Sequence, residues 1–416
     1  MKINGVKGMN DILPADVGRW QEIERTAREV FALHGYREVR TPIVEPYALY
    51  ARGVGEATDI VNKEMYVFED KGEEKLALRP EGTAGTVRAY IEHGAHVEGP
   101  QKWFYVGPMF RRERPQKGRY RQFHQIGVEA FGIAEPAIDV EQIAMLADLF
   151  GRLGVAPKVH VNSVGDAACR PAYLEELRTW LRARAGSLCA DCRERTERNP
   201  LRVLDCKVPT CQPVLAEAPR LLERLCDGCR AHFDAVRQGL DDLGVPYEVN
   251  PRLVRGLDYY VRTAYEFTSD LLGSQSAVAG GGRYDGLVET LGGPPTPGIG
   301  FGMGEERLAL MLEASGRPVP ETRPQVFFVS ADETGRREAL RRAAALRRAG
   351  VACDLDARGG KLARQFKQAE RVGARYAVVV GAAEAASGEA RLKDLSTREE
   401  SPVSLDGLVE RFRAGP

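Results

Sequence analysis

The stretch FRRERPQKGRYRQFHQIGVE (Phe110–Glu129) joins two apolar runs through a strongly basic segment. Between Arg111 and Arg121 there are six lysines and arginines against one acid, Glu113. The flanking runs, WFYVG and FHQIGVEAF, have the apolar content of β-strands. The pattern predicts a hairpin whose loop presents positive charge to phosphate groups. Because an isolated basic cluster is more often a solvated turn, this interpretation needs support from the rest of the chain.

The overall composition is that of an ordinary globular protein. The chain has 416 residues, of which 28% are charged and 43% hydrophobic, and its formal net charge is zero. This length predicts about two to four domains, and the neutral charge argues against non-specific coating of nucleic acid. There is no apolar signal segment and no run of the roughly 20 apolar residues that span a bilayer. With its eight cysteines concentrated in one region apart from Cys353, we expect a cytoplasmic protein.

Residues before the hairpin and just after it suggest an antiparallel sheet with helices grouped around it. A helix is predicted from Pro14 to about Leu33, followed by the strand-like GYREVRTPIVEP (Gly35–Pro46). A second hairpin is predicted over Met65–Thr83, with helices from about Ala84 to His93 and over Asp139–Leu153. Since strands and helices do not alternate strictly, the pattern favours an α+β domain over a doubly wound one.

A helical segment at about 171–233 interrupts this pattern and contains most of the cysteines. They form three pairs, Cys189–Cys192, Cys206–Cys211 and Cys226–Cys229. The first and third pairs are CxxC motifs whose spacing would suit one tetrahedral zinc site, with Cys189, Cys192, Cys226 and Cys229 as ligands. Buried or free thiols are the favoured interpretation, because no catalytic step requires these cysteines.

The last part of the chain has a different organisation. After a linker-like stretch at Ser315–Pro324, strands and helices alternate through QVFFVS, a basic helix, VACDLD, a second basic helix and YAVVVG. Strict alternation predicts a small parallel or mixed α/β domain. We therefore expect one domain over residues 1–324, including the helical segment, and a second over 325–416.

Five stretches, in order along the chain, resemble motifs of a known enzyme family. Three of them resemble the signature motifs of class II aminoacyl-tRNA synthetases: Gly35–Pro46, Phe110–Glu129 and GIGFGMGEERL in Gly298–Leu312. LVRGLDYY (Leu253–Tyr260) and AGGGRYDGL (Ala279–Leu287) resemble only the histidyl-tRNA synthetase family. The resemblance to bacterial members covers essentially the whole chain, and five motifs in the family order are highly specific.

The resemblance implies both a fold and an activity. The fold would be a class II catalytic domain on an antiparallel sheet, with a helical insertion and a C-terminal α/β anticodon-binding domain. The activity would be ATP-dependent attachment of L-histidine to tRNA(His) through histidyl-adenylate, releasing AMP and pyrophosphate. Its partners would be tRNA(His), L-histidine and ATP, with Mg²⁺ accompanying ATP. The first motif also implies a homodimer with that segment at the interface.

The resemblance assigns the ATP site and catalysis to a few charged side chains. Arg111 would bridge the histidine carboxylate and the α-phosphate, and Arg255 would contact the α-phosphate where relatives use a metal ion. Glu113 would lie near the adenine, with Phe123 and Arg307 on its two faces. A planar, permanently charged guanidinium suits these roles. Such positioned charge is what phosphoryl-type chemistry mainly requires.

The remaining implied contacts concern histidine and tRNA. The histidine-binding residues would be Glu81, Gly82, Thr83, Gln125, Glu129, Tyr259 and Tyr260. Glu129 and Tyr260 would be the partners of the imidazole, and Glu81 and Thr83 would receive the α-ammonium group. Amino acids whose side chains cannot pair with the imidazole partners would be rejected. At the hairpin tip, Gln116, Lys117 and Arg119 would contact the acceptor end of the tRNA.

Several alternatives stay open at this level. Glu81 precedes a predicted helix and could serve only as its cap. Arg255 could pair with Asp258 or a nearby glutamate for structure alone. The whole chain could be an inactive, synthetase-like regulatory subunit of histidine biosynthesis, although such proteins typically lack the anticodon domain and several site residues. A class II enzyme for another amino acid is disfavoured by the two histidyl motifs.

Overall fold

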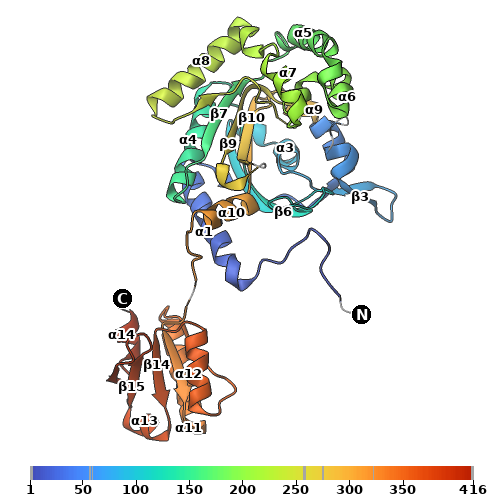
Figure 1. Cartoon of the computed structure of the whole chain (residues 1–416). Coiled ribbons are helices and arrows are strands. Elements are labelled where there is room, and N and C mark those ends of the chain that lie inside the picture. The colour runs from blue at the N-terminus through green and yellow to red at the C-terminus, as the bar shows by residue number, and fades with distance from the viewer. Residues whose placement is uncertain are drawn as a thin grey trace. The chain divides into compact units, whose positions relative to one another are not determined.

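The computed structural model describes residues 3–55, 58, 60–255, 259–273, 276–321 and 323–413. The chain divides into two compact units, Met1–Val319 and Pro320–Pro416, each with its own sheet and buried core (Figure 1). These are named the N-terminal unit and the C-terminal unit. No helix in the described part of the chain is long and apolar enough to cross a membrane.

The N-terminal unit is built on an eight-stranded sheet. Its order is β1 (Arg37–Glu38), β5 (Gln101–Phe110), β6 (Gln122–Phe131), β11 (Gly298–Gly304), β10 (Ala277–Arg283), β9 (Val261–Thr268), β7 (Lys158–Ser163) and β8 (Glu248–Val249). The two short edge strands, β1 and β8, each run parallel to the neighbouring strand, and all the other neighbouring strands pair antiparallel. The expected antiparallel α+β domain is therefore confirmed. Strands β5 and β6 are the predicted basic hairpin, paired from Gln101↔Phe131 to Phe110↔Gln122.

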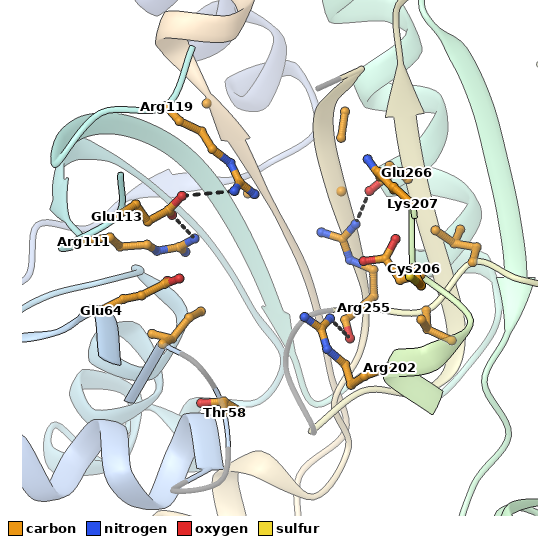
Figure 2. A pocket seen from close by; sticks show the side chains of 18 of the residues that line it. Thr58, Glu64, Arg111, Glu113, Arg119, Arg202, Cys206, Lys207, Arg255 and Glu266 are labelled. Atoms are coloured by element: carbon orange, nitrogen blue, oxygen red, sulfur yellow. Dashed lines mark hydrogen bonds and ion pairs between the residues drawn. The ribbon is translucent and has the colours of Figure 1, made fainter. Parts of the chain in front are cut away.

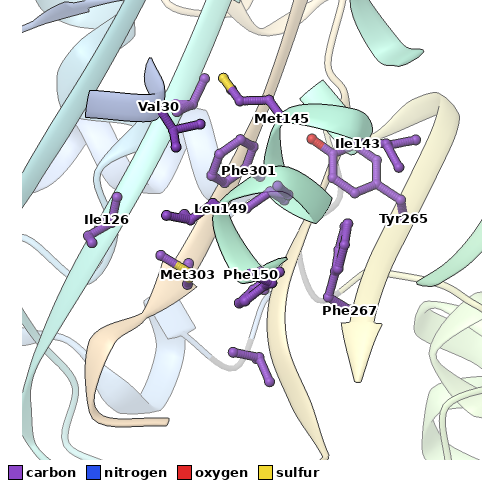
Figure 3. Close-up of a cluster of buried hydrophobic side chains, with 14 of the residues drawn as sticks. Val30, Ile126, Ile143, Met145, Leu149, Phe150, Tyr265, Phe267, Phe301 and Met303 are labelled. Atoms are coloured by element: carbon purple, nitrogen blue, oxygen red, sulfur yellow. The ribbon is translucent and has the colours of Figure 1, made fainter. Parts of the chain in front are cut away.

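Helices cover one face of this sheet and form its core. They are α1 (Pro14–Leu33), α4 (Ala137–Arg152), α8 (Asp227–Asp242) and α10 (Glu305–Ala314). Figure 3 shows Val30 of α1 and Leu149 of α4 packed against strand residues such as Phe301. Because side chains alternate along a strand, Ile126 and Val128 of β6 enter this core, whereas Glu129 points to the opposite face. The opposite face is where the polar site is built.

Smaller elements frame that face. A three-stranded sheet has the order β2 (Val44–Pro46), β4 (Lys75–Leu78) and β3 (Tyr66–Glu69), and it leads into α3 (Thr83–Glu92). The expected strand over Gly35–Pro46 is divided, since β1 joins the large sheet and β2 the small one. Short helices follow at α2 (Tyr47–Tyr50), Ala51–Gly55, Ile60–Glu64, Ala95–Glu98, Asp270–Leu272 and α9 (Leu287–Thr290).

Helices follow one another over residues 170–242, where the sequence predicts a helical segment at about 171–233. This segment, together with the turn at 166–169 that precedes it, is named the insertion. It contains α5 (Arg170–Arg182), α6 (Ala190–Arg198), α7 (Gln212–Ala216) and α8, with short helices at Ala185–Ser187, Pro200–Val203, Pro209–Cys211 and Leu221–Glu223. A separate small core holds it together, in which cysteines are prominent.

The C-terminal unit has a mixed five-stranded sheet in the order β13 (Cys353–Leu355), β12 (Val326–Ser330), β14 (Tyr376–Val380), β15 (Glu389–Asp394) and β16 (Glu400–Ser404). The first three strands are parallel, as their alternation with α11 (Glu333–Arg348) and α12 (Leu362–Arg371) predicted. The chain then adds α13 (Ala382–Ser387), an antiparallel β15–β16 hairpin and α14 (Leu408–Arg413), for which the sequence yielded no prediction.

Candidate active site

A cavity of about 890 Å³ opens in the N-terminal unit beside the β5–β6 hairpin (Figure 2). Figure 2 shows Arg111, Glu113 and Arg119 of the hairpin loop on one side and Arg255 and Glu266 on the other. Glycines of β10 and β11 supply part of the lining, together with residues of the insertion. The cavity is thus a polar cleft with guanidinium groups on opposing walls, an arrangement suited to a polyanion.

The hairpin loop is organised around Glu113. Its carboxylate lies 3.2 Å from Arg119 Nη1 and 3.8 Å from Arg111 Nη1. Arg111 also donates from Nε to the Pro80 carbonyl at 2.9 Å, and its guanidinium carbon lies 5.2 Å from the centre of the Phe123 ring. The structure therefore brings together Arg111, Glu113 and Phe123, as expected for an ATP site.

Arg307 adds a third positive group to the same wall. It belongs to the first turn of α10. Its Nη1 donates to the Ala277 carbonyl at 2.6 Å, and its Nε donates to the Gly118 carbonyl at 3.2 Å. Burial, together with the positive charges of Arg119 and Arg111, lowers the pKa of Arg307. Burial is the main cause and the two neighbouring guanidinium groups add repulsion, so an anion that binds beside Arg307 would stabilise its charged form.

Arg255 faces these groups from across the cavity. Its Nη1 lies 2.7 Å from Glu266 Oε1, and its carbonyl accepts from Arg202 Nη1 of the insertion at 3.3 Å. A Cβ on Gly280 would come within 2.4 Å of Arg255 Nη1, so only glycine lets the guanidinium lie across β10. Pairing with a nearby glutamate is therefore present, whereas Gly256, Leu257 and Asp258 of the LVRGLDYY motif lie outside the described residues.

A buried carboxylate, Glu129, forms the second half of the site. Its side chain is fully buried, and its Oε1 accepts from Thr83 Oγ1 at 2.7 Å and from the Tyr105 hydroxyl at 3.5 Å. The Tyr284 hydroxyl donates to Oε2. Burial raises the pKa of Glu129 to about 8, although the Tyr284 and Thr83 hydroxyls partly oppose this and Glu81 adds to it. A buried carboxylate with so perturbed a pKa is a functional-site candidate.

The other expected histidine contacts surround Glu129. Glu81 caps α3, with its Oε2 accepting from Thr83 N at 2.7 Å and its Oε1 from Ala84 N at 2.9 Å. The capping interpretation of Glu81 is thus what the structure shows, and burial raises its pKa. Gln125 Oε1 is buried and has no hydrogen-bond partner within the described residues. The rings of Tyr259 and Tyr260 lie 4.7 Å apart, and the Tyr259 ring lies 5.7 Å from that of Tyr284, the residue that donates to Glu129.

Glycine makes room for the buried carboxylate. A Cβ on Gly300 of β11 would lie 1.8 Å from Glu129 Oε2 and 2.4 Å from the Val128 carbonyl. We expect Gly300→Ala to lower the free energy of unfolding by about 1–3 kcal/mol, because the core cannot accommodate the methyl group.

Urea denaturation measures this loss, with Gly286→Ala as the matched control. A Cβ on Gly286 would meet no atom within 4 Å among the described residues, so its effect should stay within about 0.5 kcal/mol. Equal effects of the two substitutions would show that the space beside Glu129 does not depend on Gly300.

Two contributors to the site, Tyr105 and Arg202, were missed by sequence reasoning. Tyr105 lies in the apolar run WFYVG, where only strand alternation could have pointed to its inward hydroxyl. Arg202 reaches Arg255 from the insertion, far along the chain, and no local signal identifies it, whereas Glu266 is the kind of nearby glutamate that the sequence led us to expect. At the hairpin tip Gln116 and Lys117 are exposed, whereas Arg119 turns toward Glu113 and lines the cavity.

The grouping of cysteines considered from the sequence is wrong. Cys189, Cys192, Cys226 and Cys229 do not form one cluster, because the structure divides them between two. The first pair lies with Cys206 and Cys211, and the second pair lies with Asp166 and Cys169. Sequence spacing favoured the two CxxC motifs, but the helices between them bring other partners closer.

Comparison with known proteins matches both units. A family model described as "Histidyl-tRNA synthetase" matches residues 8–308, and one described as "Anticodon binding domain" matches 325–415. A protein of Anaeromyxobacter dehalogenans named histidine–tRNA ligase is 77% identical over 99% of both chains. One of Geobacter metallireducens with the same name is 50% identical, over 97% of this chain and 98% of its own. The apo crystal structure of S. aureus histidyl-tRNA synthetase is 38% identical, with a TM-score of 0.84 over 99% of this chain and 100% of that one.

Proposed function

The chain belongs to the histidyl-tRNA synthetase family, and on that premise we propose that it attaches L-histidine to tRNA(His). Histidine and ATP would first form histidyl-adenylate with release of pyrophosphate. The histidyl group would then pass to the tRNA with release of AMP. The observation that carries this proposal is that strand β6 contributes Phe123 and Gln125 to the arginine-lined cavity and also holds the buried carboxylate of Glu129.

Adenylate formation requires ATP and the amino-acid carboxylate to be held in line, with negative charge stabilised at the α-phosphorus. We assign this work to Arg111 and Arg255, which face the cavity from opposite walls (Figure 2). Phe123 and Arg307 would hold the adenine between them, with Glu113 at its edge. Magnesium would enter with ATP as part of the substrate, and Glu113, Glu266 and Glu306 supply carboxylate oxygens of the kind it prefers.

Histidine would be recognised at the buried end of the cleft. Glu129 is an acceptor for an imidazole N–H where water is excluded, with Tyr260 and Gln125 nearby. Glu81 and Thr83, at the start of α3, would receive the α-ammonium group, with Gly82 giving close backbone approach. A site whose buried polar groups are satisfied only by histidine rejects other amino acids strongly.

Transfer RNA would be bound at two places. The hairpin tip, with Gln116, Lys117 and Arg119, would approach its acceptor end. In the C-terminal unit, Arg336 of α11 pairs with Glu333, and Arg341 and Arg342 pair with Glu338. Helix α12 exposes basic side chains three and four residues apart on one face, Arg364, Lys367 and Arg371, of which Arg364 also lies 3.5 Å from Asp356. We therefore favour α12 for backbone contacts, which add affinity and salt dependence.

We also propose a homodimer. The family's first motif, Gly35–Pro46, exposes Ile43 and Val44, each 41% accessible in the single chain. Apolar side chains on short edge elements suit burial against a second copy. The catalytic region would extend over 1–324 and the anticodon-binding region over 325–416, close to the division of the two compact units.

Histidine-dependent ATP–pyrophosphate exchange tests the proposed function directly. Each amino acid would be supplied in turn with ATP and labelled pyrophosphate, and we expect exchange with histidine alone. A regulatory subunit would exchange with none of them. That alternative is disfavoured because Arg111, Arg255, Arg307, Glu81 and Glu129 are all present and the anticodon-binding domain is matched. Exchange with proline or threonine would assign the chain to another class II specificity.

A further inference from the structure

The insertion contains two compact groups of metal-binding side chains. The sulfur atoms of Cys189, Cys192, Cys206 and Cys211 all lie within 4.8 Å of one another. The same is true of the ligand atoms of Asp166, Cys169, Cys226 and Cys229. Each group offers four donors, which is the number that a structural zinc ion takes. Cys206 of the first group also lines the cavity, but none of these eight side chains has a role in the proposed adenylation.

The spacing of the donor atoms fits a single tetrahedral ion. With Zn–S bonds of about 2.3 Å, two sulfurs of a tetrahedral site lie roughly 3.8 Å apart, and Cys189 Sγ lies 3.9 Å from Cys206 Sγ. A disulfide requires about 2.05 Å, and all eight cysteines are free in the structure. In the second group, Asp166 Oδ1 lies 3.8 Å from the sulfurs of Cys169 and Cys226, close to the roughly 3.5 Å of a tetrahedral O–Zn–S angle.

Chain geometry supplies each group with paired ligands at helix starts. Cys189 is the N-cap of α6 and Cys192 lies in its first turn, while Cys226 and Cys229 have the same positions at α8. Asp166 and Cys169 have the same two-residue spacing, and Cys169 is the N-cap of α5. A helix N-terminus stabilises a thiolate, which is the form that binds zinc. Close packing of so many thiolates is favourable only with a cation among them.

The insertion also needs cross-links, because its apolar core is small. Cysteines are five of the fifteen buried residues in that core, namely Cys169, Cys192, Cys206, Cys211 and Cys229. Between α6 and α8 the chain forms no helix longer than five residues and no strand. Segments of this kind usually depend on disulfides or a metal for stability. Since the cysteines are unpaired, a metal is the remaining cross-link.

We propose that the insertion binds two zinc ions, one held by Cys189, Cys192, Cys206 and Cys211 and the other by Asp166, Cys169, Cys226 and Cys229. Soft thiolate ligands in tetrahedral arrangement select zinc over harder cations. The first ion joins α6 to the segment around Cys206, whose neighbours Arg202 and Lys207 line the cavity (Figure 2). The second joins the end of β7 to the starts of α5 and α8. Both ions are structural, and the proposal does not depend on the amino acid that the site activates.

Metal analysis of the full-length protein, purified under reducing conditions without chelator, tests the proposal. We expect two equivalents of zinc per chain, falling to one in Cys192→Ser and to one in Cys229→Ser. These positions are fully buried and belong to different groups. Cys353→Ser is the matched control, since Cys353 is a buried cysteine of the C-terminal unit that belongs to neither group. It should retain both ions.

Cobalt substitution of the wild-type protein tests the two sites without relying on the variants, because a misfolded variant would lose metal for that reason alone. In wild-type protein refilled with Co²⁺, each site should give thiolate-to-metal charge-transfer bands and the intense d–d bands of tetrahedral cobalt. Absence of stoichiometric zinc or of these bands in the wild type would overturn the proposal, as would iron in place of zinc. A single zinc ion lost only in Cys192→Ser would overturn the second site and retain the first.

Discussion

Replacing Arg255 with alanine should lower histidine-dependent ATP–pyrophosphate exchange by roughly 10²–10³-fold, about 2.7–4 kcal/mol of transition-state stabilisation. The guanidinium faces Arg111 across the cavity and lies on glycine backbone, where it is positioned before ATP arrives. Charge that is already positioned requires no reorganisation when negative charge develops at the α-phosphorus. Arg255→Lys should recover only part of the rate, because an ammonium group lacks the planar fork.

The ion pair with Glu266 makes a structural role the competing explanation for Arg255. Glu266→Gln distinguishes them, since it removes the 2.7 Å ion pair but leaves the arginine in place. If Arg255 acts on ATP, Glu266→Gln should cost much less exchange activity than Arg255→Ala, and both variants should unfold near the wild-type temperature. Equal losses, or a residual Arg255→Ala rate within about tenfold of wild type, would show that the catalytic assignment is wrong.

The control for this series is Arg152→Ala. Arg152 is an exposed arginine of α4 whose Nε lies 3.0 Å from Asp148, so it too loses an ion pair on substitution. It lies outside the cavity lining, and its exchange rate should match that of the wild type. A surface pair of this type contributes about 0–1 kcal/mol to stability.

Local sequence patterns were sufficient to predict most of the helices and strands that frame the site. Helix α1 begins at Pro14 and ends at Leu33 as predicted, because proline at a helix start and glycine after its end are strong signals. The β5–β6 hairpin was equally evident from two apolar runs around a basic loop. The family motifs then predicted that Arg111 and Arg307 share one site, and both side chains line the cavity.

The contacts that the sequence could not predict are those between segments far apart in the chain. Arg119 was expected at the free tip, but Glu113 draws it into the cavity. The zinc-like spacing of the CxxC pairs suggested the wrong four ligands, because Asp166 and Cys169 lie before the expected start of the helical segment. Such partnerships are set by how the helices of the insertion pack, and no periodicity in the sequence encodes them.

Substituting Glu129 with glutamine should have opposite effects on histidine use and on stability. Loss of a charge-assisted hydrogen bond, about 1.5–3 kcal/mol, should raise the KM for histidine by roughly 10–150-fold while the KM for ATP changes little. Without histidine the variant should be more stable than the wild type at alkaline pH, because it no longer has to bury a carboxylate. Exchange kinetics and thermal unfolding over a range of pH values measure the two effects.

The direction of the pH effect follows from the pKa of about 8 in the folded protein, which lies above the ordinary value of 4.5. Between these values the folded chain retains a proton that the unfolded chain has lost. Raising the pH through this window therefore lowers the free energy of unfolding, by at most about 1.4 kcal/mol per pH unit from this group. The difference between wild type and Glu129→Gln should grow from near pH 5 and become constant above about pH 8.

Glu313→Gln is the control, since Glu313 is an exposed carboxylate on α10 and its loss should leave the wild-type pH profile unchanged. A Glu129→Gln profile parallel to the wild type would show that Glu129 does not titrate in this window. A histidine KM within about fivefold of wild type would reject it as the imidazole acceptor. These two outcomes can be told apart, because the pH profile is measured on the empty protein and the KM reports on the complex with histidine. If both expectations hold, Glu129 destabilises the empty protein at neutral pH and in return selects histidine, as is common for binding groups.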